Sequence, residues 1–403
     1  MSIRIDSQKN TEVSDIFYRY GEEYRSTNKI TKDQHKVMNN IVNCRTSYFG
    51  YHQDKCDNCE HMESEFNSCR DRHCPKCQAV SKRKWIDARL QDILPVPYYH
   101  VVFTLPSQLH DLLSYNKKLI YNLLFSCSSQ TLLAFGHDRK WLGGELGFIG
   151  VLHSWGQTLW PHPHLHFLVP GGALTGDGRW IAPRYSSKFL FPVHAMSKVF
   201  KGKFIEALKE SNARGEIVLP PKDSRQERPV EFEGWLGKLS GRDWVVYCKS
   251  PLENPEQVVR YIGRYTHRIA IGNSRILDAQ DGKVTFKYKD YKVSRTNWKE
   301  MTLDAQEFIR RFLWHTLPAG FHKIRHFGFL ANGRRRFSIP LINRILHNDQ
   351  DKTSNTDEYR KPCPECESGS LIPQMIVTRF GKVALTCAVL FMGCGGTTVY
   401  DST

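Results

Sequence analysis

The amino-acid sequence predicts an α+β protein, in which strands and helices are preceded by a helical segment and a zinc-binding ribbon. Three observations predict this fold class. Six of the 12 cysteines lie between Cys44 and Cys77, strand-like runs with short connections follow them, and long runs of helical periodicity stand between those strands. A chain of 403 residues with 40% hydrophobic residues can bury a core in two or three domains.

The chain begins with a helical pattern. Spacings of three and four predict a helix through Val13, Ile16, Tyr20 and Tyr24, and a second run follows over residues 38–42. Later changes in composition set the other boundaries. We expect a helical segment over residues 1–43, a zinc-binding ribbon over 44–95, the main α+β domain over 96–345, and a linker with a small cysteine-containing module over 346–403.

Strands in the main domain are indicated by β-branched and aromatic runs. The runs 146–157 and 164–169 are joined by a short link that contains Pro161, which predicts an antiparallel pair. Further strands are expected at 99–105, 244–248 and 282–288, and helices at 82–93, 109–135, 196–211 and 308–317.

The charge of the chain is strongly positive. Lys and Arg number 57 against 41 Asp and Glu, which gives a formal net charge of +16. A polyanion is therefore the natural partner, nucleic acid first, and the alternatives are a role in solubility or attraction to acidic membranes. No apolar run approaches the roughly 18 to 20 residues that span a bilayer, and Met1–Asn10 is polar. We expect a cytoplasmic protein with no membrane partner.

Two C-x2-C pairs mark the ribbon. Cys56 and Cys59 are followed, at an ordinary zinc-ribbon spacing, by Cys74 and Cys77. Two such pairs complete a tetrahedral four-thiolate shell, so we expect a structural Zn²⁺ held by these four residues. In a cytosolic chain the spacing indicates metal thiolates rather than disulfides. Such a closed site stabilises the fold and performs no chemistry.

Other cysteines and histidines leave two further zinc sites open. A second ion in the ribbon has as candidate ligands Cys44, His52, Cys69 and His73. The pair Cys363 and Cys366 also has the C-x2-C spacing, but its candidate partners Cys387 and Cys394 are too widely spaced to form another such pair.

Three histidines alternate along one predicted strand. His162, His164 and His166 point to one side of such a strand, while Leu165 and Phe167 point to the other. Strand histidines two residues apart can share one divalent ion and leave positions open for a phosphate oxygen. The other interpretation is a set of hydrogen-bonded structural histidines.

A third protein ligand is expected from the neighbouring strand. Gln157 lies near the end of that strand, and its amide oxygen suits a hard ion. His153 or His162 can take its place.

A predicted helix after residue 254 carries two tyrosines. Asn254, Pro255 and Gln257 have the form of an N-cap, a first-turn proline and a capping-box partner. Tyr261 and Tyr265 are four residues apart and therefore project from one face. Tyr20 and Tyr24 share that spacing, so the spacing alone is more often a sign of packing. The neighbours differ: Glu22 and Glu23 would repel a phosphate, whereas basic residues surround the later pair, namely Arg260, Arg264, His267 and Arg268.

The ordered combination of cysteine ribbon, His-x-His strand and two-tyrosine helix resembles the two-tyrosine HUH transposases of rolling-circle bacterial insertion sequences. The resemblance covers most of residues 10–340 and is carried by the segments 67–77, 160–172, 260–271 and 326–332. It implies the HUH palm, with its central antiparallel sheet, as the catalytic domain over 96–345. It also implies His164 and His166 as metal ligands and Tyr261 and Tyr265 as nucleophiles.

The resemblance implies strand transfer on DNA. With Mg²⁺ or Mn²⁺ beside the scissile phosphate, a tyrosine would attack and give a 5′-phosphotyrosine and a free 3′-hydroxyl, which a second transfer can later rejoin. The expected partners are single-stranded or hairpin DNA of transposon ends and target DNA, within the nucleoid of a bacterial cytoplasm. The alternatives are a replication initiator or relaxase that nicks DNA, or a non-catalytic zinc-ribbon protein that binds DNA.

Basic residues are the candidates for holding the DNA strand. Each is by itself equally well explained as an exposed charge. The candidates for direct DNA contact are Arg264, Arg268, Lys287, Lys289, Lys292, Arg295, Arg334 and Arg335.

Overall fold

The computed structural model divides the chain into two compact units. The first is formed by residues 1–79, 271–310 and 352–403, and the second by residues 80–270 and 311–351. The structure describes residues 11–184, 189–220, 232–249, 254, 259, 263, 269–290, 297–346, 361–366 and 368–384. This division differs from the four predicted segments, because parts of the chain that are far apart in the sequence fold together.

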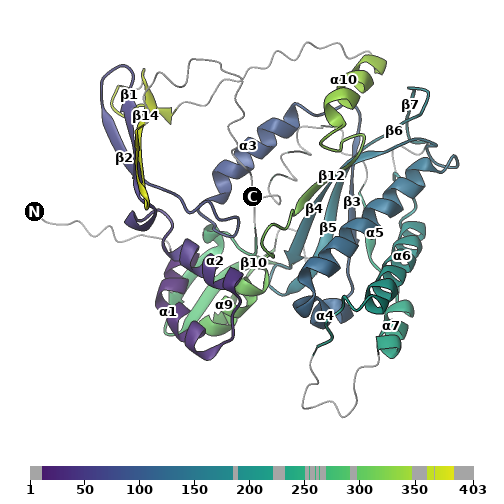
Figure 1. The fold of residues 1–403 in the computed structure, drawn as a ribbon, viewed down its shortest axis with the longest axis horizontal. Helices are drawn as coiled ribbons and strands as arrows, with labels where there is room; N and C mark the ends of the chain where they lie inside the picture. Colours follow the sequence, from purple (N-terminus) through teal and green to yellow (C-terminus); the bar gives the residue numbers. More distant parts are fainter. Residues whose placement is uncertain are drawn as a thin grey trace, which may run out of the picture. The chain divides into compact units, whose positions relative to one another are not determined.

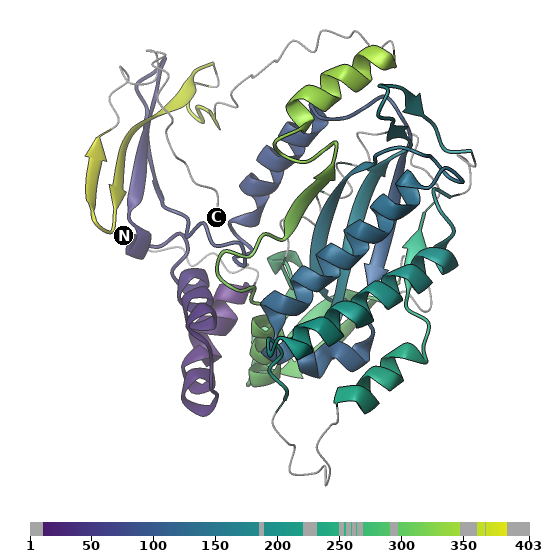
Figure 2. The same cartoon turned by 45° about the vertical axis from the view of Figure 1, so that its right-hand side comes forward.

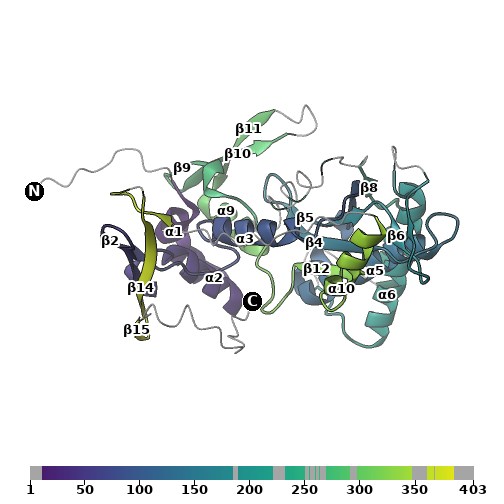
Figure 3. The same cartoon turned by 90° about the horizontal axis from the view of Figure 1, so that it is seen from above.

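The first unit contains the ribbon and a separate small sheet. Its ribbon sheet has the strand order β13-β14-β1-β2, with β15 paired to β14. Its other sheet has the order β11-β10-β9, and its strands run side by side in Figure 3. The elements are α1 (Val13–Thr27), α2 (Lys32–Val42), β1 (Tyr51–Cys56), β2 (Met62–Phe66), β9 (Ile276–Gln280), β10 (Lys283–Lys289), β11 (Trp298–Asp304), β13 (Lys361–Pro362), β14 (Ser370–Thr378) and β15 (Gly381–Ala384), and α9 (Ala305–Trp314) follows β11.

Local chemistry explains where the first helices begin. The side chain of Thr31 accepts a hydrogen bond from the backbone N–H of Gln34, and the Gln34 side chain accepts one from the Thr31 backbone. This capping box satisfies two backbone donors at the start of α2. Along α1, Val13, Ile16 and Tyr24 are buried, as the periodicity predicted, and Phe17 is buried with them.

The C-terminal module is part of the ribbon. Strand β14 pairs antiparallel with β1, from Tyr51 opposite Val377 to Cys56 opposite Leu371. The predicted small module over 346–403 therefore contributes strands to the sheet that β1 and β2 begin. This pairing joins residues more than 300 positions apart in the sequence, which no local pattern indicates.

The second unit is built on a five-stranded antiparallel sheet with the order β12-β4-β5-β3-β8. The predicted α+β class with a central antiparallel sheet is thus confirmed (Figure 1). The strands are β3 (Tyr98–Thr104), β4 (Gly147–Trp155), β5 (Pro161–Pro170), β8 (Val246–Cys248) and β12 (Ile324–Gly328), with a small pair β6 (Ala173–Leu174) and β7 (Trp180–Ile181). The helices are α3 (Gln78–Leu90), α4 (His110–Tyr115), α5 (Lys117–His137), α6 (Val193–Ala213), α7 (Phe232–Ser240) and α10 (Arg335–Ile345).

Helices cover both faces of this sheet (Figure 2). On one face, α5 and α6 bury an aromatic layer in which Phe103 lies 5.0 Å from Phe200 between ring centroids. Leu165 and Phe167 point into this layer and are fully buried, as the alternation predicted. On the other face, α3 and α10 pack over Ile149, Val151 and Leu168. The same second face carries the histidines of β5.

Helix α5 is long and apolar enough in composition to cross a membrane, which the sequence reasoning missed. More than half of its apolar stretch is buried within the protein, 56%, and its Phe125 contacts the rings of Phe321 and Phe327. Gly150 of β4 allows this close packing, because a Cβ there would lie 2.6 Å from the Phe167 ring and 3.3 Å from that of Phe125. Its burial and contacts are those of a core helix.

Candidate metal centre and zinc clusters

Three imidazoles meet on adjacent strands at one end of the central sheet. His153 of β4 lies directly opposite His164 of β5 in the register, and His166 follows two residues later on the same face. One nitrogen of each ring lies within 4.8 Å of one nitrogen of the other two. The Nε2 atom of His166 is 3.1 Å from Nδ1 of His153. The register of two antiparallel strands therefore assembles a three-nitrogen site.

Burial keeps the imidazoles of His164 and His166 neutral. His153 and His164 are 3% and 9% exposed, while His166 is partly open to solvent. Burial lowers the pKa of His164 to about 3 and that of His166 well below its ordinary value. A metal ligand must offer an unprotonated nitrogen. The site therefore offers such nitrogens at neutral pH.

A hydrogen bond indicates which nitrogen His164 presents. Nδ1 of His164 lies 2.5 Å from the backbone carbonyl oxygen of His162. Because a carbonyl only accepts, Nδ1 carries the proton and Nε2 keeps its lone pair for a metal. The side chain of His162 itself is exposed.

His100 of β3 contacts the ring of His166 and holds it in place. Its Nε2 atom lies 2.7 Å from Nδ1 of His166, and the two rings are stacked with centroids 4.9 Å apart. Burial, with a smaller effect of Lys249, lowers the pKa of His100 to about 4. A neutral His100 that accepts from His166 Nδ1 would direct Nε2 of His166 toward His153, because a metal-binding histidine usually donates its other ring N–H to a neighbouring acceptor. The sequence reasoning missed His100, although it stands in a predicted strand.

The third ligand was left open between Gln157, His153 and His162. Gln157 lies in the turn after β4 and is partly exposed. His153 is the alternative whose nitrogen lies among those of His164 and His166. The geometry favours His153, and the role of Gln157 stays a prediction.

The two predicted nucleophiles, Tyr261 and Tyr265, lie outside the described residues, as do Arg264 and Arg268. Two neighbours in the same segment are described. Val259 is 2% exposed and packs in the core that contains Ile149, Val151 and Leu168. A Cβ at Gly263 would lie 2.5 Å from Cγ1 of Ile86. Val259 and Gly263 thus lie close against neighbouring elements.

Eight cysteines form two four-sulfur clusters in the first unit. One contains Cys44, Cys69, Cys74 and Cys77, with Sγ of Cys77 3.5 Å from Sγ of both Cys44 and Cys69. Hydrogen bonds from Cys69 and Cys74 lower the pKa of the Cys44 thiol to about 7. Four thiolates at these separations fit a tetrahedral zinc ion.

The other cluster joins the two ends of the chain. Its members are Cys56, Cys59, Cys363 and Cys366, with Sγ of Cys56 3.7 Å from that of Cys366 and Sγ of Cys59 3.6 Å from that of Cys363. A backbone hydrogen bond from Gly369 is the largest cause that lowers the pKa of Cys366 to about 6. The pairing of β1 with β14 places both C-x2-C pairs at the same end of the sheet.

The predicted grouping of the cysteines is therefore corrected. The sequence analysis assigned Cys56 and Cys59 to one site with Cys74 and Cys77, whereas each pair belongs to a different cluster. The predicted second site is corrected too: Cys44 and Cys69 belong to the cluster of Cys74 and Cys77. Among the described residues, its other two candidates lie outside both clusters: Nδ1 of His52 lies 3.1 Å from Asn67 Oδ1, and His73 pairs with Asp71 at 2.8 Å.

We expect zinc stoichiometry to report this grouping. The double substitution Cys363→Ser with Cys366→Ser removes half of the ligands of one cluster, so zinc measured by atomic emission should fall from two ions per chain to one. Cys248→Ser, outside both clusters, should keep two. Two ions retained in the double variant would instead support the pairing of Cys56 and Cys59 with Cys74 and Cys77.

With this geometry in place, the chain matches two protein-family models. The model described as a transposase zinc-binding domain matches residues 16–105, and the Y2 model described as a putative transposase matches residues 147–337. A putative transposase, y4qJ of Sinorhizobium fredii, is 41% identical over 382 residues, which are 91% of this chain and 95% of that protein. The chain belongs to the two-tyrosine transposase family.

Other similarities are weaker. The transposase for insertion sequence element IS801 of Pseudomonas savastanoi pv. phaseolicola is 27% identical over 300 residues, 74% of this transposase and 70% of that one. Two structures of the conjugative relaxase TrwC in complex with oriT DNA show 10% and 11% identity with TM-scores of 0.22 and 0.24. They cover 58% and 64% of this chain and 94% and 96% of theirs. These scores are too low to support a likeness of fold.

The cations predicted to contact DNA differ in their surroundings in the transposase. Lys287 is exposed, and Nζ of Lys289 lies 5.1 Å from the centre of the Trp298 ring. Arg334 makes two hydrogen bonds, at 2.5 and 2.8 Å, with the Glu145 carboxylate. Arg335 forms a longer ion pair, and the remaining candidates, Lys292 and Arg295, lie outside the described residues.

Proposed function

We propose that this transposase nicks and rejoins single-stranded DNA at transposon ends by attack of a tyrosine on a phosphodiester beside an imidazole-bound divalent ion. The observation that carries the proposal is the meeting of His153, His164 and His166 on two paired strands. Membership in a two-tyrosine transposase family supports the nucleophiles Tyr261 and Tyr265. We place this activity at the nucleoid of a bacterial cytoplasm.

The three histidines fit a catalytic divalent ion better than a structural one. Three protein ligands leave positions open for a phosphate, whereas each cysteine cluster supplies four and is closed. Nitrogen donors suit Mn²⁺ better than Mg²⁺, which prefers oxygen. A bound ion would polarise the scissile phosphate and stabilise the charge that develops on it. The partial exposure of His166 leaves that side of the site accessible.

The chain itself supplies the nucleophile. The phenol oxygen of Tyr261 or Tyr265 forms a bond to phosphorus while the bond from phosphorus to the 3′ oxygen breaks, and the phenol proton passes to that oxygen or to solvent. The products are a 5′-phosphotyrosine and a 3′-hydroxyl. One phosphate ester replaces another, so a new 3′-hydroxyl can reverse the step without ATP. A second tyrosine permits a second transfer before the first bond is resolved.

Single-stranded or hairpin DNA is the proposed substrate because a duplex keeps its bases paired and stacked. A basic chain with exposed aromatics binds an unpaired strand by its phosphates and by stacking. Trp160 and Trp298 are 51% and 49% exposed, and each has a cation over its ring, Arg311 at 4.5 Å and Lys289 at 5.1 Å from the ring centre.

A covalent-trapping gel tests the proposed function. The zinc-loaded transposase is incubated with single-stranded DNA of its element end, labelled on the 3′ side of the expected nick, with and without Mn²⁺. We expect a labelled protein band that resists denaturation and appears only with the ion. A protein band labelled only when the label lies on the 5′ side of the nick would show a 3′-phosphotyrosine and refute the proposed 5′ linkage. Salt-sensitive binding without any adduct would indicate a non-catalytic DNA-binding protein.

A further inference from the structure

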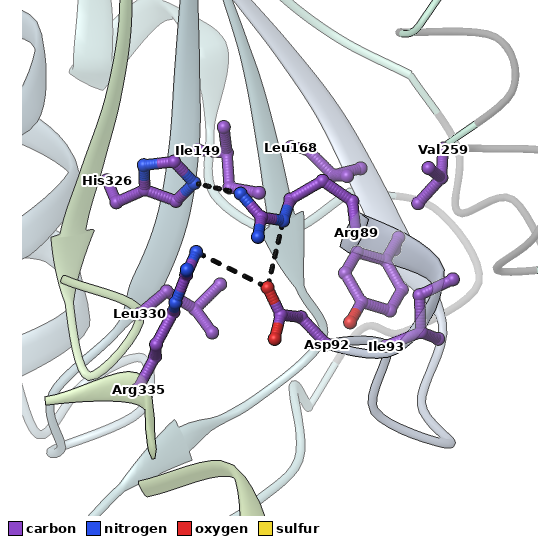
Figure 4. Close-up of a pocket in the computed structure, with 10 residues that line it drawn as sticks. Arg89, Asp92, Ile93, Ile149, Leu168, Val259, His326, Leu330 and Arg335 are labelled. Carbon is purple, nitrogen blue, oxygen red and sulfur yellow. Dashed lines mark hydrogen bonds and ion pairs between the residues drawn. The ribbon is translucent and has the colours of Figure 1, made fainter. Parts of the chain in front are cut away.

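Figure 4 shows a small pocket. Two of the residues that line it, Ile149 and Leu168, lie on the sheet face that carries His164 and His166. Its floor is formed by Ile149 and Leu168, which are opposite each other in the register, and His326 of β12 lies opposite Ile149. Leu168 follows His166 by two residues, a step of about 7 Å along a strand. The pocket therefore adjoins the candidate metal centre along the sheet.

Two arginines in this pocket share one carboxylate. Nε of Arg89 lies 2.8 Å from Oδ2 of Asp92, and Nη1 of Arg335 lies 3.4 Å from the same oxygen. The side chains are largely withdrawn from solvent, with 11%, 28% and 24% of Arg89, Arg335 and Asp92 exposed. Among the described residues, two guanidinium groups against one carboxylate leave one positive charge uncompensated, which is costly away from water.

His326 does not reduce this charge imbalance. Nη1 of Arg89 lies 3.3 Å from Nε2 of His326, and because an arginine only donates, Nε2 is the acceptor. Burial, with smaller effects of Arg89 and Arg335, lowers the pKa of His326 to about 4. The imidazole is therefore neutral at pH 7 and adds neither compensation nor charge.

The arginine N–H groups that face Asp92 are poorly satisfied. Within the described residues, the buried Nη1 of Arg335 makes no hydrogen bond of good geometry, and the buried Nε of Arg89 has only its ion pair with Asp92 at 2.8 Å. Buried donors without an aligned acceptor are uncommon in folded proteins. Together with the net charge, they indicate that an anionic acceptor belongs in this pocket.

We propose that the pocket binds one phosphate group of the DNA strand, with a non-bridging oxygen held by Arg89 and Arg335. The cavity volume of about 20 Å³ decides between a phosphate oxygen and a base. One water-sized group needs roughly 10 to 15 Å³, so a phosphate oxygen fits and a nucleobase does not. Guanidinium groups are well matched to phosphate oxygens in charge and geometry.

This inference rests on the proposed function and adds to it a fixed position of the DNA strand relative to the imidazoles. His166 and His326 are two strands and two residues apart across the sheet, about 12 Å between their Cα atoms. A strand bound in the pocket at one phosphate would present a second phosphate, at a fixed offset, to the imidazoles. The pocket thereby helps to select the phosphate that is cut. It reads the backbone and not the base sequence.

Salt-dependent binding tests the pocket. The variant is Arg335→Gln, and the control is Arg336→Gln, which removes the same charge from an exposed side chain stacked on Phe337. The full-length zinc-loaded protein is titrated with a labelled 20-nucleotide single strand at several salt concentrations, without Mn²⁺. We expect Arg335→Gln to lower affinity about tenfold and to reduce the slope of log affinity against log salt by about 0.7, the value for one lost phosphate contact on a single strand. Arg336→Gln should retain the wild-type slope.

A thermal melt with inorganic phosphate gives a second measurement. We expect phosphate to raise the melting temperature of the wild type and of Arg336→Gln, but not of Arg335→Gln or Arg89→Gln. A slope and a phosphate response that survive in Arg335→Gln would show that the ion pairs only hold α3 and α10 together. If the wild type forms the covalent adduct but Arg335→Gln keeps the wild-type salt slope, the phosphate pocket is refuted and the proposed function stands. If the salt slope falls in Arg335→Gln but the wild type forms no adduct, the proposed nicking chemistry is refuted and the pocket stands.

Discussion

Simultaneous replacement of Tyr261 and Tyr265 by phenylalanine is expected to abolish the covalent adduct between the transposase and single-stranded DNA. Phenylalanine keeps the ring but lacks the oxygen that bonds to phosphorus, so the loss should reach the detection limit of the gel. Each single variant should still form an adduct through the remaining tyrosine, but should fail to complete a second strand transfer before the first is resolved.

The control for this experiment is Tyr20→Phe. Tyr20 and Tyr24 share the spacing of four residues, but they lie on α1. The Tyr20 hydroxyl accepts from the backbone N–H of Gly282 at 3.3 Å, and burial raises the pKa of Tyr24. These contacts indicate a role of both tyrosines in packing, so Tyr20→Phe should form the adduct at the wild-type rate. An adduct lost in Tyr20→Phe and kept in the double variant would place the nucleophile on α1 and contradict its assignment to Tyr261 and Tyr265.

Removal of one imidazole is expected to slow adduct formation by about 10² to 10³. A bound divalent ion contributes several kcal/mol of charge stabilisation, and each 1.36 kcal/mol is worth about tenfold in rate. We expect His164→Ala and His153→Gln to show this loss in single-turnover kinetics, together with weakened Mn²⁺ binding in calorimetry. His194→Ala, an exposed histidine on α6, should behave as the wild type.

The same measurement decides the third ligand. Gln157→Ala should change Mn²⁺ affinity little if His153 completes the set. If His153→Gln binds Mn²⁺ fully and Gln157→Ala does not, then Gln157 is the third ligand, as the sequence analysis first suggested. Both variants are read by calorimetry without DNA, so the result does not depend on the identity of the nucleophile.

Short-range patterns predicted much of the second unit correctly. Alternation along residues 164–169 indicated a strand with Leu165 and Phe167 buried, and the short link at Pro161 indicated its antiparallel partner. These predictions succeeded because neighbouring residues on one strand and a tight connection leave little choice of arrangement. Strand β12 and helix α10 were missed. His326 lies on β12 and Arg335 begins α10.

The cysteine clusters show the limit of local reasoning. A C-x2-C pair is recognisable because two thiols three residues apart can hold one ion, and all three pairs were recognised. The predicted partnership of Cys56 and Cys59 with Cys74 and Cys77 was wrong, because the partners of Cys56 and Cys59 are set by β1 pairing with β14 across more than 300 residues. Predicted DNA contacts depend on tertiary neighbours in the same way, since Arg334 meets Glu145 only in the folded chain.

The sequence by itself determined the class of fold and the types of metal-binding residue. It also provided the two-tyrosine helix as a candidate and the net positive charge that favours a polyanionic partner. Each of these depends on residues that are close together in the chain or on composition. Only the tertiary structure decided that His153 joins His164 and His166, that His100 stands behind them, and that Arg89 and Arg335 share Asp92. The physical reason is that these groups meet through strand register and helix packing, which place distant residues within a few ångströms.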